Sequence, residues 1–517
     1  MPATTKAERI LLSRNIFTAT DDKPFAGFVA IADGAILGVG PGDGAEFRGE
    51  NTEVRDLGDK TVCPGFFDSH CFFTGYAMGF IGVDLSGTGS LADALGAAEK
   101  YAGALPPGSP VLGHGLKAAI DDDAVAALEK RFGARPTVLF ADGGETCLMN
   151  AAARARYGFT PDACYAEMIW KLIAEVMRDR DFIVPMFRRY MKLMNSKGVT
   201  SVKEMGFDDY YGFADILEEL DRAGELTLRV SFMSQPVGRG MDLEHGRVMR
   251  GRFTGDFVRF SGYNRMTDGS IGQHQGDLKE PYDDKPGVRC AQDIDYPAIE
   301  REVLAADAEG FRFSLHAQGD AAVAKVLDIY EKCAKGSDDK VKNRQAITDL
   351  ELSDPADLER MGRLGVVAEV YPQIPTLYNR QEKLEMIAAR VGDRGRYYWN
   401  RRTMADSGVT ISCATDLPLL VDDIPESIYC ACGGYFADGG EPFNPGNALT
   451  VAELLRAWCR GGAVNLSCED RLGTLEVGKT ADITVLDAPV FDIDPAKVRD
   501  VKVCATFVAG REVYAGE

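Results

Sequence analysis

The sequence predicts an α/β fold, a (β/α)8 TIM-like barrel with a small composite β-sandwich domain formed by both termini. The barrel is indicated by short apolar runs, among them "GVTSVKE", "FRFSLHA", "GVVAEVY" and "GVTISCATD". These runs alternate with segments of helical periodicity such as "DYPAIEREVLAADAEGF". Strands that alternate with helices along most of a chain are typical of βα units around a parallel sheet.

The β-sandwich is indicated by the two ends of the chain. Residues 1–63 and 472–517 share short strands of alternating apolar and polar residues, separated by Asp-Gly, Gly-Asp and Gly-Lys turns. These two pieces can pair only if the barrel is inserted between them. We therefore expect a composite domain of residues 1–63 and 472–517, and a barrel of residues 64–471 with an inserted helical segment around 75–194.

The inserted segment is rich in Met, Trp and Tyr, and contains "YAEMIWKLIAEVMRDRDFIVPMFRRYMKLM". This composition is typical of a pair of buried amphipathic helices, and it would also suit a lid over an apolar substrate. A large apolar segment outside the barrel makes a homo-oligomer, for example a homodimer, a reasonable expectation.

Charge and composition limit the partners and the compartment. The formal charge of −21 over 517 residues argues against nucleic acid and against an anionic membrane as a partner, and it says nothing else about the substrate. The N-terminus lacks the apolar run of a secretion signal, and no stretch approaches the length of a membrane span. The twelve cysteines are scattered without zinc-knuckle spacing, as in reduced cytosolic proteins. We therefore expect a cytoplasmic protein.

Polar residues follow the apolar runs at the points where the predicted strands end. In a closed barrel these positions lie at the C-terminal mouth, where active sites are found. The polar strand-end residues are Lys203, Glu204, His316, Tyr371 and Asp416.

The first predicted barrel strand, in "TVCPGFFDSHCFFTG", reaches its C-terminal end at His70. A metal-binding strand would present a second imidazole two residues later on the same face, but that position is Phe72. We interpret His70 as functional and Phe72 as a pocket wall, because a bulky ring would fill the space beside it. No GxSxG serine elbow occurs in the chain.

Six motifs follow one another along the chain in this order: "VCPGFFDSH", "GVTSV", "TDGSIG", "HAQGDAAVAKVLD", "ATDLP" and "LGTLEVGKTADITVLDA". On these motifs the chain resembles the amidohydrolase superfamily, and most closely its N-substituted formamide deformylase-like branch. The resemblance covers nearly the whole chain. It implies a metal-dependent barrel that hydrolyses an amide or a related C–N bond, in which the ion lowers the pKa of a bound water to about 7.

The ligand set that the resemblance implies is matched only in part. The first histidine of the family's His-x-His pair falls on His70, and the second falls on Phe72. The position of the family's carboxylated lysine falls on Asn264 or, with a local insertion, on Arg259, and neither side chain can be carboxylated. The histidine of "HAxGD" is retained as His316.

Three further positions carry carboxylates. The family's second downstream histidine falls on Asp349, with Glu351 nearby, and the terminal aspartate is retained as Asp416. A histidine of the inserted segment aligns with Glu145. Oxygen ligands in place of imidazoles suit a harder ion such as Mg²⁺ or Mn²⁺, whereas paired carboxyl groups near histidines also suit acid–base chemistry without a metal.

We therefore expect an amidohydrolase-like hydrolase of a small organic substrate with an atypical mononuclear site for one divalent ion, Zn, Mn or Mg. Water would attack a carbonyl, and the C–N bond, or the C–C bond of a cyclic ketone or diketone, would break. Asp416 would deprotonate the water. The catalytic candidates are Asp416, His316 and Glu145; the metal-ligand candidates are His70, His316, Asp349 and Asp416; the substrate-binding candidates are Phe72, His274 and Asn264.

Two other functions remain open at this point. The first is a metal-free lyase or isomerase in which histidines and carboxylates at the mouth move protons next to a carbonyl. The second is a catalytically silent scaffold that binds a small molecule.

Overall fold

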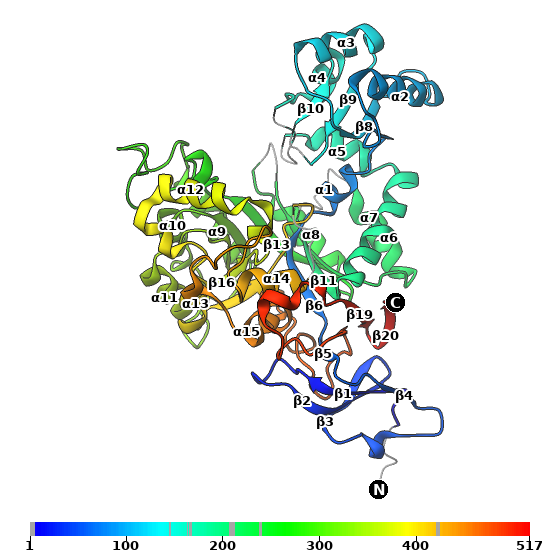
Figure 1. Ribbon diagram of the computed structural model, residues 1–517, viewed down its shortest axis with the longest axis vertical. Helices are drawn as coiled ribbons and strands as arrows, with labels where there is room; N and C mark the ends of the chain where they lie inside the picture. Colours follow the sequence, from blue (N-terminus) through cyan, green and yellow to red (C-terminus); the bar gives the residue numbers. More distant parts are fainter. Residues whose placement is uncertain are drawn as a thin grey trace.

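The computed structural model describes residues 6–143, 146–162, 164, 168–205, 212–236, 240–419 and 424–516. Three parts follow one another along the long axis of the molecule (Figure 1). A sheet built from both termini lies at one end, the barrel lies in the middle, and an inserted lobe lies at the other end. No helix in the described ranges is both long and apolar enough to cross a membrane.

The barrel sheet has eight strands, and all neighbouring pairs are parallel. An isolated bridge links Cys71, in the first strand, to Leu417, which follows the last strand, so the sheet is nearly closed. The predicted TIM-like barrel is therefore confirmed. In sheet order the strands are β6 (Phe66–Cys71), β11 (Val199–Met205), β12 (Arg229–Ser234), β13 (Val258–Met266), β14 (Phe313–Ala317), β15 (Ala346–Asp349), β16 (Val367–Val370) and β17 (Thr410–Cys413).

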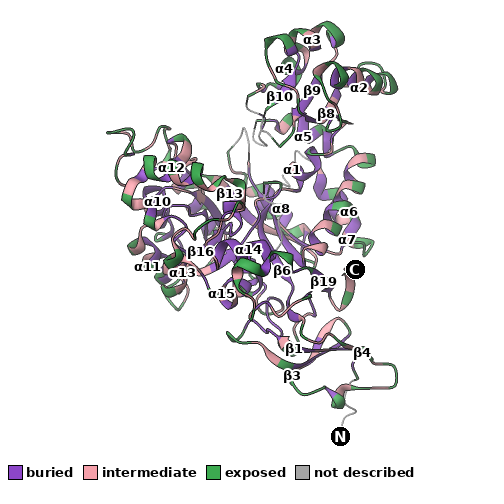
Figure 2. Ribbon diagram, viewed as in Figure 1, coloured by how far each residue is buried: buried purple, intermediate pink, exposed green. Residues whose placement is uncertain are grey.

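Helices surround these strands and turn their exposed faces outwards (Figures 1 and 2). Their ends follow local sequence signals: Asp354 caps the first turn of α11, Pro355 begins it, and Gly365 ends it with a φ of +68°. The helices after β11 and beyond are α7 (Phe213–Arg222), α8 (Leu243–Arg252), α9 (Tyr296–Ala308), α10 (Asp320–Tyr330), α11 (Pro355–Leu364), α12 (Arg380–Val391), α13 (Arg401–Asp406), α14 (Ile424–Ala431), α15 (Val451–Arg456) and α16 (Gly462–Asn465).

The terminal sheet joins both ends of the chain, as predicted. Strand β5 pairs antiparallel with β18, and this ladder connects the N-terminal and C-terminal pieces. Apolar side chains from both pieces, including Leu11, Val62, Ile483 and Phe507, form one buried cluster. The strands in order are β20 (Arg511–Ala515), β19 (Val503–Val508), β18 (Ile483–Leu486), β5 (Thr61–Pro64), β1 (Arg9–Ile16), β2 (Phe25–Ala32) and β3 (Ala35–Pro41), with β4 (Glu53–Asp56) paired to β1.

The inserted segment contains a small sheet as well as helices. Its four strands are β7 (Val83–Asp84), β8 (Val111–Leu116), β9 (Thr137–Ala141) and β10 (Cys147–Met149), and it carries α2 (Leu91–Ala104), α3 (Asp122–Phe132) and α4 (Ala151–Tyr157). The expectation of a helical insertion was therefore incomplete. These strands are short, and glycines interrupt the apolar pattern of β8, so the alternation that marks a strand is weak.

Three helices connect this lobe to the barrel: α1 (Phe73–Met78), α5 (Trp170–Val176) and α6 (Arg180–Ser196). The Met- and aromatic-rich helix α6 buries one face, which includes Phe187, Tyr190 and Met194, in the main core. It therefore packs as an amphipathic helix.

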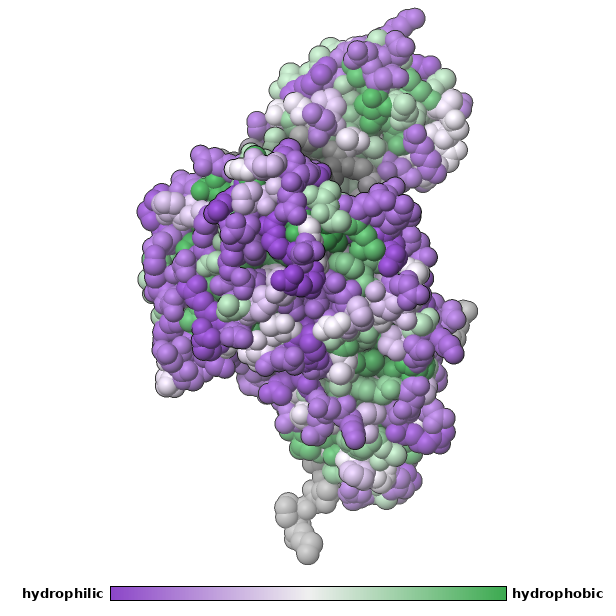
Figure 3. Space-filling model, turned by 60° about the vertical axis from the view of Figure 1, so that its left-hand side comes forward, coloured by the Kyte–Doolittle hydropathy of each residue, from purple (hydrophilic) through white to green (hydrophobic). Residues whose placement is uncertain are grey.

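Hydrophilic side chains cover most of the face shown in Figure 3, with smaller apolar areas between them. Large exposed apolar side chains among the described residues are few. They are Val54, Met168, Val248, Met266, Leu377, Leu419 and Val477.

Candidate active site

The barrel interior holds polar side chains in two layers, because residues two apart in a strand point to the same side. Ser314 and His316 have this spacing in β14, and Glu369 and Tyr371 have it in β16 and directly after it. Ser314 Oγ contacts Glu369 Oε1 at 3.3 Å, so these two side chains belong to the deeper layer. His316 and Tyr371 belong to the layer at the C-terminal mouth, where barrel enzymes bind substrates.

His70 and Asp416 face each other at this mouth. His70 Nε2 lies 3.6 Å from Asp416 Oδ1, and the two side chains are 7% and 25% exposed. The backbone N–H of Asp416 donates to the carbonyl oxygen of His70 at 2.8 Å, which fixes the two chain segments side by side. The gap between the side chains is longer than a good hydrogen bond, but it is short enough for one water molecule to contact both.

His316 is held between two carboxylates. Its Nε2 lies 2.9 Å from Asp349 Oδ2, and its Nδ1 lies 3.5 Å from Asp268 Oδ1. Burial lowers the pKa of His316, but the contacts with Asp268 and Asp349 outweigh this effect and raise it to about 10. Asp268 is itself fixed, since it accepts hydrogen bonds from the backbone N–H groups of Gln318, Gly319 and Asp277. The ring of His316 is therefore an imidazolium at neutral pH.

A buried carboxylate lies directly below His70. Glu369 is fully buried, and its Oε2 lies 3.8 Å from His70 Nδ1. Burial raises the pKa of Glu369, but the combined effects of Lys203, His70 and Arg312 outweigh it and lower the pKa far below its usual range. The donors that contact Glu369 are Lys203 Nζ, Asn465 Nδ2 at 3.0 Å, Thr348 Oγ1 at 3.0 Å, Arg312 Nη2 at 3.2 Å and Ser314 Oγ at 3.3 Å.

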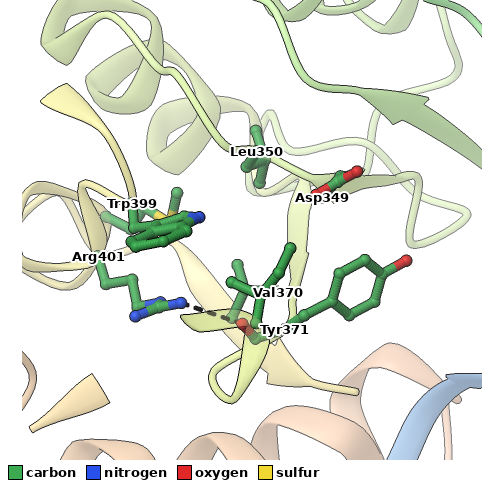
Figure 4. Close-up of a pocket in the computed structure, with 8 residues that line it drawn as sticks. Asp349, Leu350, Val370, Tyr371, Trp399 and Arg401 are labelled. Carbon is green, nitrogen blue, oxygen red and sulfur yellow. Dashed lines mark hydrogen bonds between the residues drawn. The ribbon is translucent and has the colours of Figure 1, made fainter. Parts of the chain in front are cut away.

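Two aromatic rings pack against His70. The ring centroid of Phe72 lies 5.4 Å away and that of Tyr371 5.8 Å away, both edge-on. Figure 4 shows the Tyr371 ring and Asp349 on one side of a narrow crevice, and Trp399 and Arg401 on the other. Phe72 packs beside His70 but is not among the residues that line this crevice, so its role as a pocket wall remains a prediction.

The other predicted residues lie elsewhere or outside the described residues. Asn264 is buried in β13, where its Nδ2 donates to Gln235 Oε1 at 3.0 Å. His274 Nε2 lies 3.0 Å from Asp284 Oδ1, so that ring is engaged in a loop ion pair. Glu145 lies outside the described residues. A substrate-binding role for Asn264 and His274 remains a prediction.

Glu369 and Asp268 were not identified from the sequence, and Lys203 and Tyr371 were noted there only as polar strand-end residues without an assigned role. One signal was present in the sequence, since "GVTSVKE" and "GVVAEVY" each place a charged residue inside an apolar run. A charged residue at an inward-facing strand position requires a partner of opposite charge.

A metal centre at the barrel mouth would need several side-chain donors that converge on one point. Among the residues that the structure describes, no three His, Cys, Asp or Glu side chains converge as metal ligands. His70 and Asp416 form a facing pair, but both ring nitrogens of His316 point at carboxylates. A catalytic metal needs several protein ligands with free lone pairs and an open position. The described residues therefore do not fit such a centre, and the predicted ligand roles remain predictions.

Comparisons with known proteins agree with this architecture. A model of the amidohydrolase family matches residues 53–514. The chain is 25% identical to YtcJ of Bacillus subtilis (strain 168), with 96% of this chain and 98% of that protein covered. It is 24% identical to N-substituted formamide deformylase of Arthrobacter pascens, with 98% of each covered. A solved structure, an uncharacterized metal-dependent hydrolase from Pyrococcus horikoshii OT3, has a TM-score of 0.73 at 22% identity, with 95% of this chain and 98% of that chain covered.

Proposed function

Since the chain belongs to the amidohydrolase family and is a hydrolase of that superfamily, we propose that it hydrolyses a small carbonyl compound at the barrel mouth. Asp416 takes a proton from a water molecule, His70 holds that water, and Tyr371 donates a hydrogen bond to the carbonyl oxygen. The observation that carries this proposal is the 3.6 Å gap between His70 Nε2 and Asp416 Oδ1.

In this proposal the water contacts His70 Nε2 and Asp416 Oδ1 from one side of the pair. Glu369 faces Nδ1 of the His70 ring at 3.8 Å, so Nε2 is the nitrogen directed at Asp416 and the water. A carboxylate behind an imidazole fixes the orientation of the ring and stabilises any positive charge that develops on it. Asp416 is the more exposed member of the pair, which allows water and substrate to reach its carboxylate.

The carbonyl oxygen accepts a hydrogen bond from the Tyr371 hydroxyl. Burial, followed by the charges of Asp416 and Asp349, raises the pKa of Tyr371 well above its usual range, so the phenol keeps its proton at neutral pH. A positioned donor of this kind stabilises the negative charge that develops on oxygen during water attack.

The reaction ends with the return of the proton. The water oxygen bonds to the carbonyl carbon while Asp416 accepts the proton. The tetrahedral intermediate then collapses, the C–N bond or the C–C bond of a cyclic ketone or diketone breaks, and Asp416 gives the proton to the leaving atom. The imidazolium of His316 counters the charge of Asp349, which keeps the mouth from becoming strongly negative.

The substrate has an apolar body in this proposal. Three of the large exposed apolar side chains follow or end barrel strands: Met266 ends β13, and Leu377 and Leu419 come after β16 and β17. Together with Phe72 they give the mouth an apolar rim, which favours a small organic molecule over a highly polar one.

No step of this proposal passes through a metal, because the described donors do not fit one. The test is elemental mass spectrometry of protein purified without chelators or nickel resin, with a screen of amides, lactones and cyclic diketones before and after chelation. We expect less than one metal ion per chain and turnover that survives chelation. About one Zn, Mn or Mg ion per chain, lost together with activity in His70→Ala and His316→Ala, would contradict the proposal.

The same screen distinguishes the other functions. Turnover in heavy-oxygen water places solvent oxygen in the carboxyl group that hydrolysis forms, whereas the proton transfers of the lyase or isomerase considered above form no carboxyl group from water. A folded protein that turns over none of the compounds, and whose Asp416→Asn variant behaves identically, would indicate a binding scaffold.

A further inference from the structure

A buried arginine beside the proposed active site has no carboxylate partner. Arg401, in α13, is 5% exposed. Within the described part of the chain its hydrogen bonding is limited to one bond, from Nη2 to the backbone oxygen of Tyr371 at 3.0 Å, and no Asp or Glu pairs with it. A buried charge without a counter-charge is costly, so folded proteins pair such groups or use them to bind a ligand.

The indole of Trp399 presents a second unused donor next to Arg401. Its Nε1 is buried and, in the described ranges, has no hydrogen-bond partner. The Arg401 guanidinium carbon lies 5.9 Å from the centre of the Trp399 ring, so the two donors are neighbours. Buried indole N–H groups usually find an acceptor.

The turn that presents these two side chains is strained. Trp399 has a φ of +49°, a conformation that bulky residues rarely adopt. Two backbone hydrogen bonds hold it there, from Trp399 N to Glu351 O and from Arg401 N to Trp399 O, both at 2.7 Å. Strain that the surrounding structure maintains is typical of ligand-binding segments.

Both donors line the narrow crevice shown in Figure 4. The crevice is partly open to solvent, but in this structure its walls stand too close together for a water molecule to fit between them. The walls are otherwise apolar, from Leu350, Val370, Ile374 and Met404. Asp349 and Tyr371 also line the crevice, so it adjoins the site where the carbonyl is proposed to react.

The other charged groups near the crevice already have partners. Asp349 is paired with His316 at 2.9 Å, and Glu351 accepts from Tyr398 and contacts Lys383 Nζ at 3.4 Å. Arg401 is therefore the cation of this region whose charge the described residues leave unbalanced.

We propose that this crevice is a subsite for a carboxylate of the substrate, bound by the guanidinium of Arg401 and the indole N–H of Trp399. This inference rests on the proposed function and narrows its substrate to a carbonyl compound that also bears an acidic group. The two oxygens of a carboxylate match the fork of a guanidinium, and the walls of the crevice move apart to admit it. A neutral apolar group of the substrate in the crevice would offer no acceptor to the guanidinium of Arg401 or to the indole N–H of Trp399.

Binding of small carboxylates to the folded protein tests the subsite without any need for turnover. The chain has three tryptophans, and Trp399 lies in the crevice, so a ligand there changes the intrinsic fluorescence. Short-chain monocarboxylates and dicarboxylates are titrated against their primary amides of equal size, with calorimetry as a second measurement. We expect the carboxylates to bind at least about tenfold more tightly than the amides.

Variants of Arg401 and Trp399 test whether the preference for carboxylates over amides arises in the crevice. Arg401→Met is expected to abolish it, Arg401→Lys to retain part of it, and Trp399→Phe to remove the fluorescence change while weakening the binding that calorimetry measures. If Arg401→Met fails to fold, the Arg401→Lys and Trp399→Phe results decide. Equal binding of carboxylates and amides, or a preference that these variants leave unchanged, would overturn the subsite.

A control separates this inference from the proposed function. Asp416→Asn is expected to bind carboxylates like the wild type although it loses turnover. A wild type that binds carboxylates at Arg401 but hydrolyses nothing would therefore refute the proposed reaction and keep the subsite.

Discussion

Nδ1 of His70 lies 3.8 Å from Oε2 of Glu369, so the imidazole at the barrel mouth sits on a fully buried carboxylate. Glu369, in β16, in turn contacts Lys203, in β11, and these two strands are not neighbours in the sheet. His70, which is proposed to hold the attacking water, is thus connected to the buried ion pair of Lys203 and Glu369 in the barrel interior.

Lys203→Met is expected to lower the free energy of unfolding by about 3–5 kcal/mol. Lys203 and Glu369 are both fully buried, and the substitution leaves the carboxylate without its nearest cation. Denaturant titration followed by circular dichroism measures the loss.

A double substitution checks that the loss reflects the ion pair. Lys203→Met combined with Glu369→Leu removes both charges, and we expect it to be less destabilising than the sum of the two single changes. Strict additivity of the two single changes would show that the two side chains do not stabilise each other.

Asp416→Asn is expected to lower kcat by about 10²–10⁴ on the first substrate found, because the amide cannot accept the proton of the water. KM should change little, since Asn has the same size and the residue is proposed to act on water. Steady-state kinetics, with circular dichroism as the check of folding, measures the effect. A kcat within a factor of about two of the wild type would exclude Asp416 as the base.

Tyr371→Phe is expected to lower kcat by about 10²–10³, because it removes the one hydroxyl proposed to donate to the carbonyl oxygen. The ring that packs on His70 at 5.8 Å is retained, so the position of His70 should not change. The matched control is Tyr378→Phe, a tyrosine that follows the same strand but does not contact His70. Equal losses in both variants would indicate a general effect on folding.

The barrel could be predicted from the sequence because its strands are buried apolar runs with helices between them. The terminal sheet could be predicted because both ends repeat the same pattern of strands and turns. The inserted sheet could not, since β7 has two residues and β10 has three, too few for any periodicity to appear.

His70, His316 and Asp416 could be proposed as site residues from the sequence because each follows or ends a single predicted strand. The site was not predictable where the chemistry needs the register of two distant strands. Lys203 and Glu369 are separated by 166 residues, and only closure of the barrel brings them together. Arg401 could not be identified for the same reason, because its lack of a counter-charge among the described residues is visible only in the folded structure.

The stability of the protein is expected to depend on pH through Glu204. Burial raises the pKa of Glu204 from 4.5 to about 8, so the folded protein binds this proton more tightly than the unfolded chain does. The contribution of Glu204 is therefore fully present below pH 4.5 and declines as the pH rises toward 8. Glu204→Gln should remove this decline. The free energy of unfolding of the variant, relative to that of the wild type, should therefore be higher at pH 8 than at pH 4.5 by roughly 2–4 kcal/mol. An identical pH dependence in both proteins would contradict the assignment.

Cys147 and Cys164 are expected to form a disulfide under mild oxidation. Their sulfur atoms lie 3.0 Å apart, although the nearest cysteines in sequence are Cys430 and Cys432. With glutathione disulfide as the oxidant, the two thiols lose two protons and two electrons, and two molecules of glutathione are formed. The bond closes a loop of 17 residues, for which the chain-entropy model predicts a gain of about 3 kcal/mol.

Thiol titration and peptide mapping measure this reaction. The twelve free thiols should fall to ten, the crosslinked peptides should contain Cys147 and Cys164, and Cys164→Ser should keep its remaining eleven thiols under the same treatment. The burial of both side chains makes access of the oxidant the slow step, so the rate should rise in low denaturant. A crosslink at Cys430 and Cys432 instead, or twelve thiols retained after exposure in low denaturant, would show that the short sulfur–sulfur distance does not lead to bond formation.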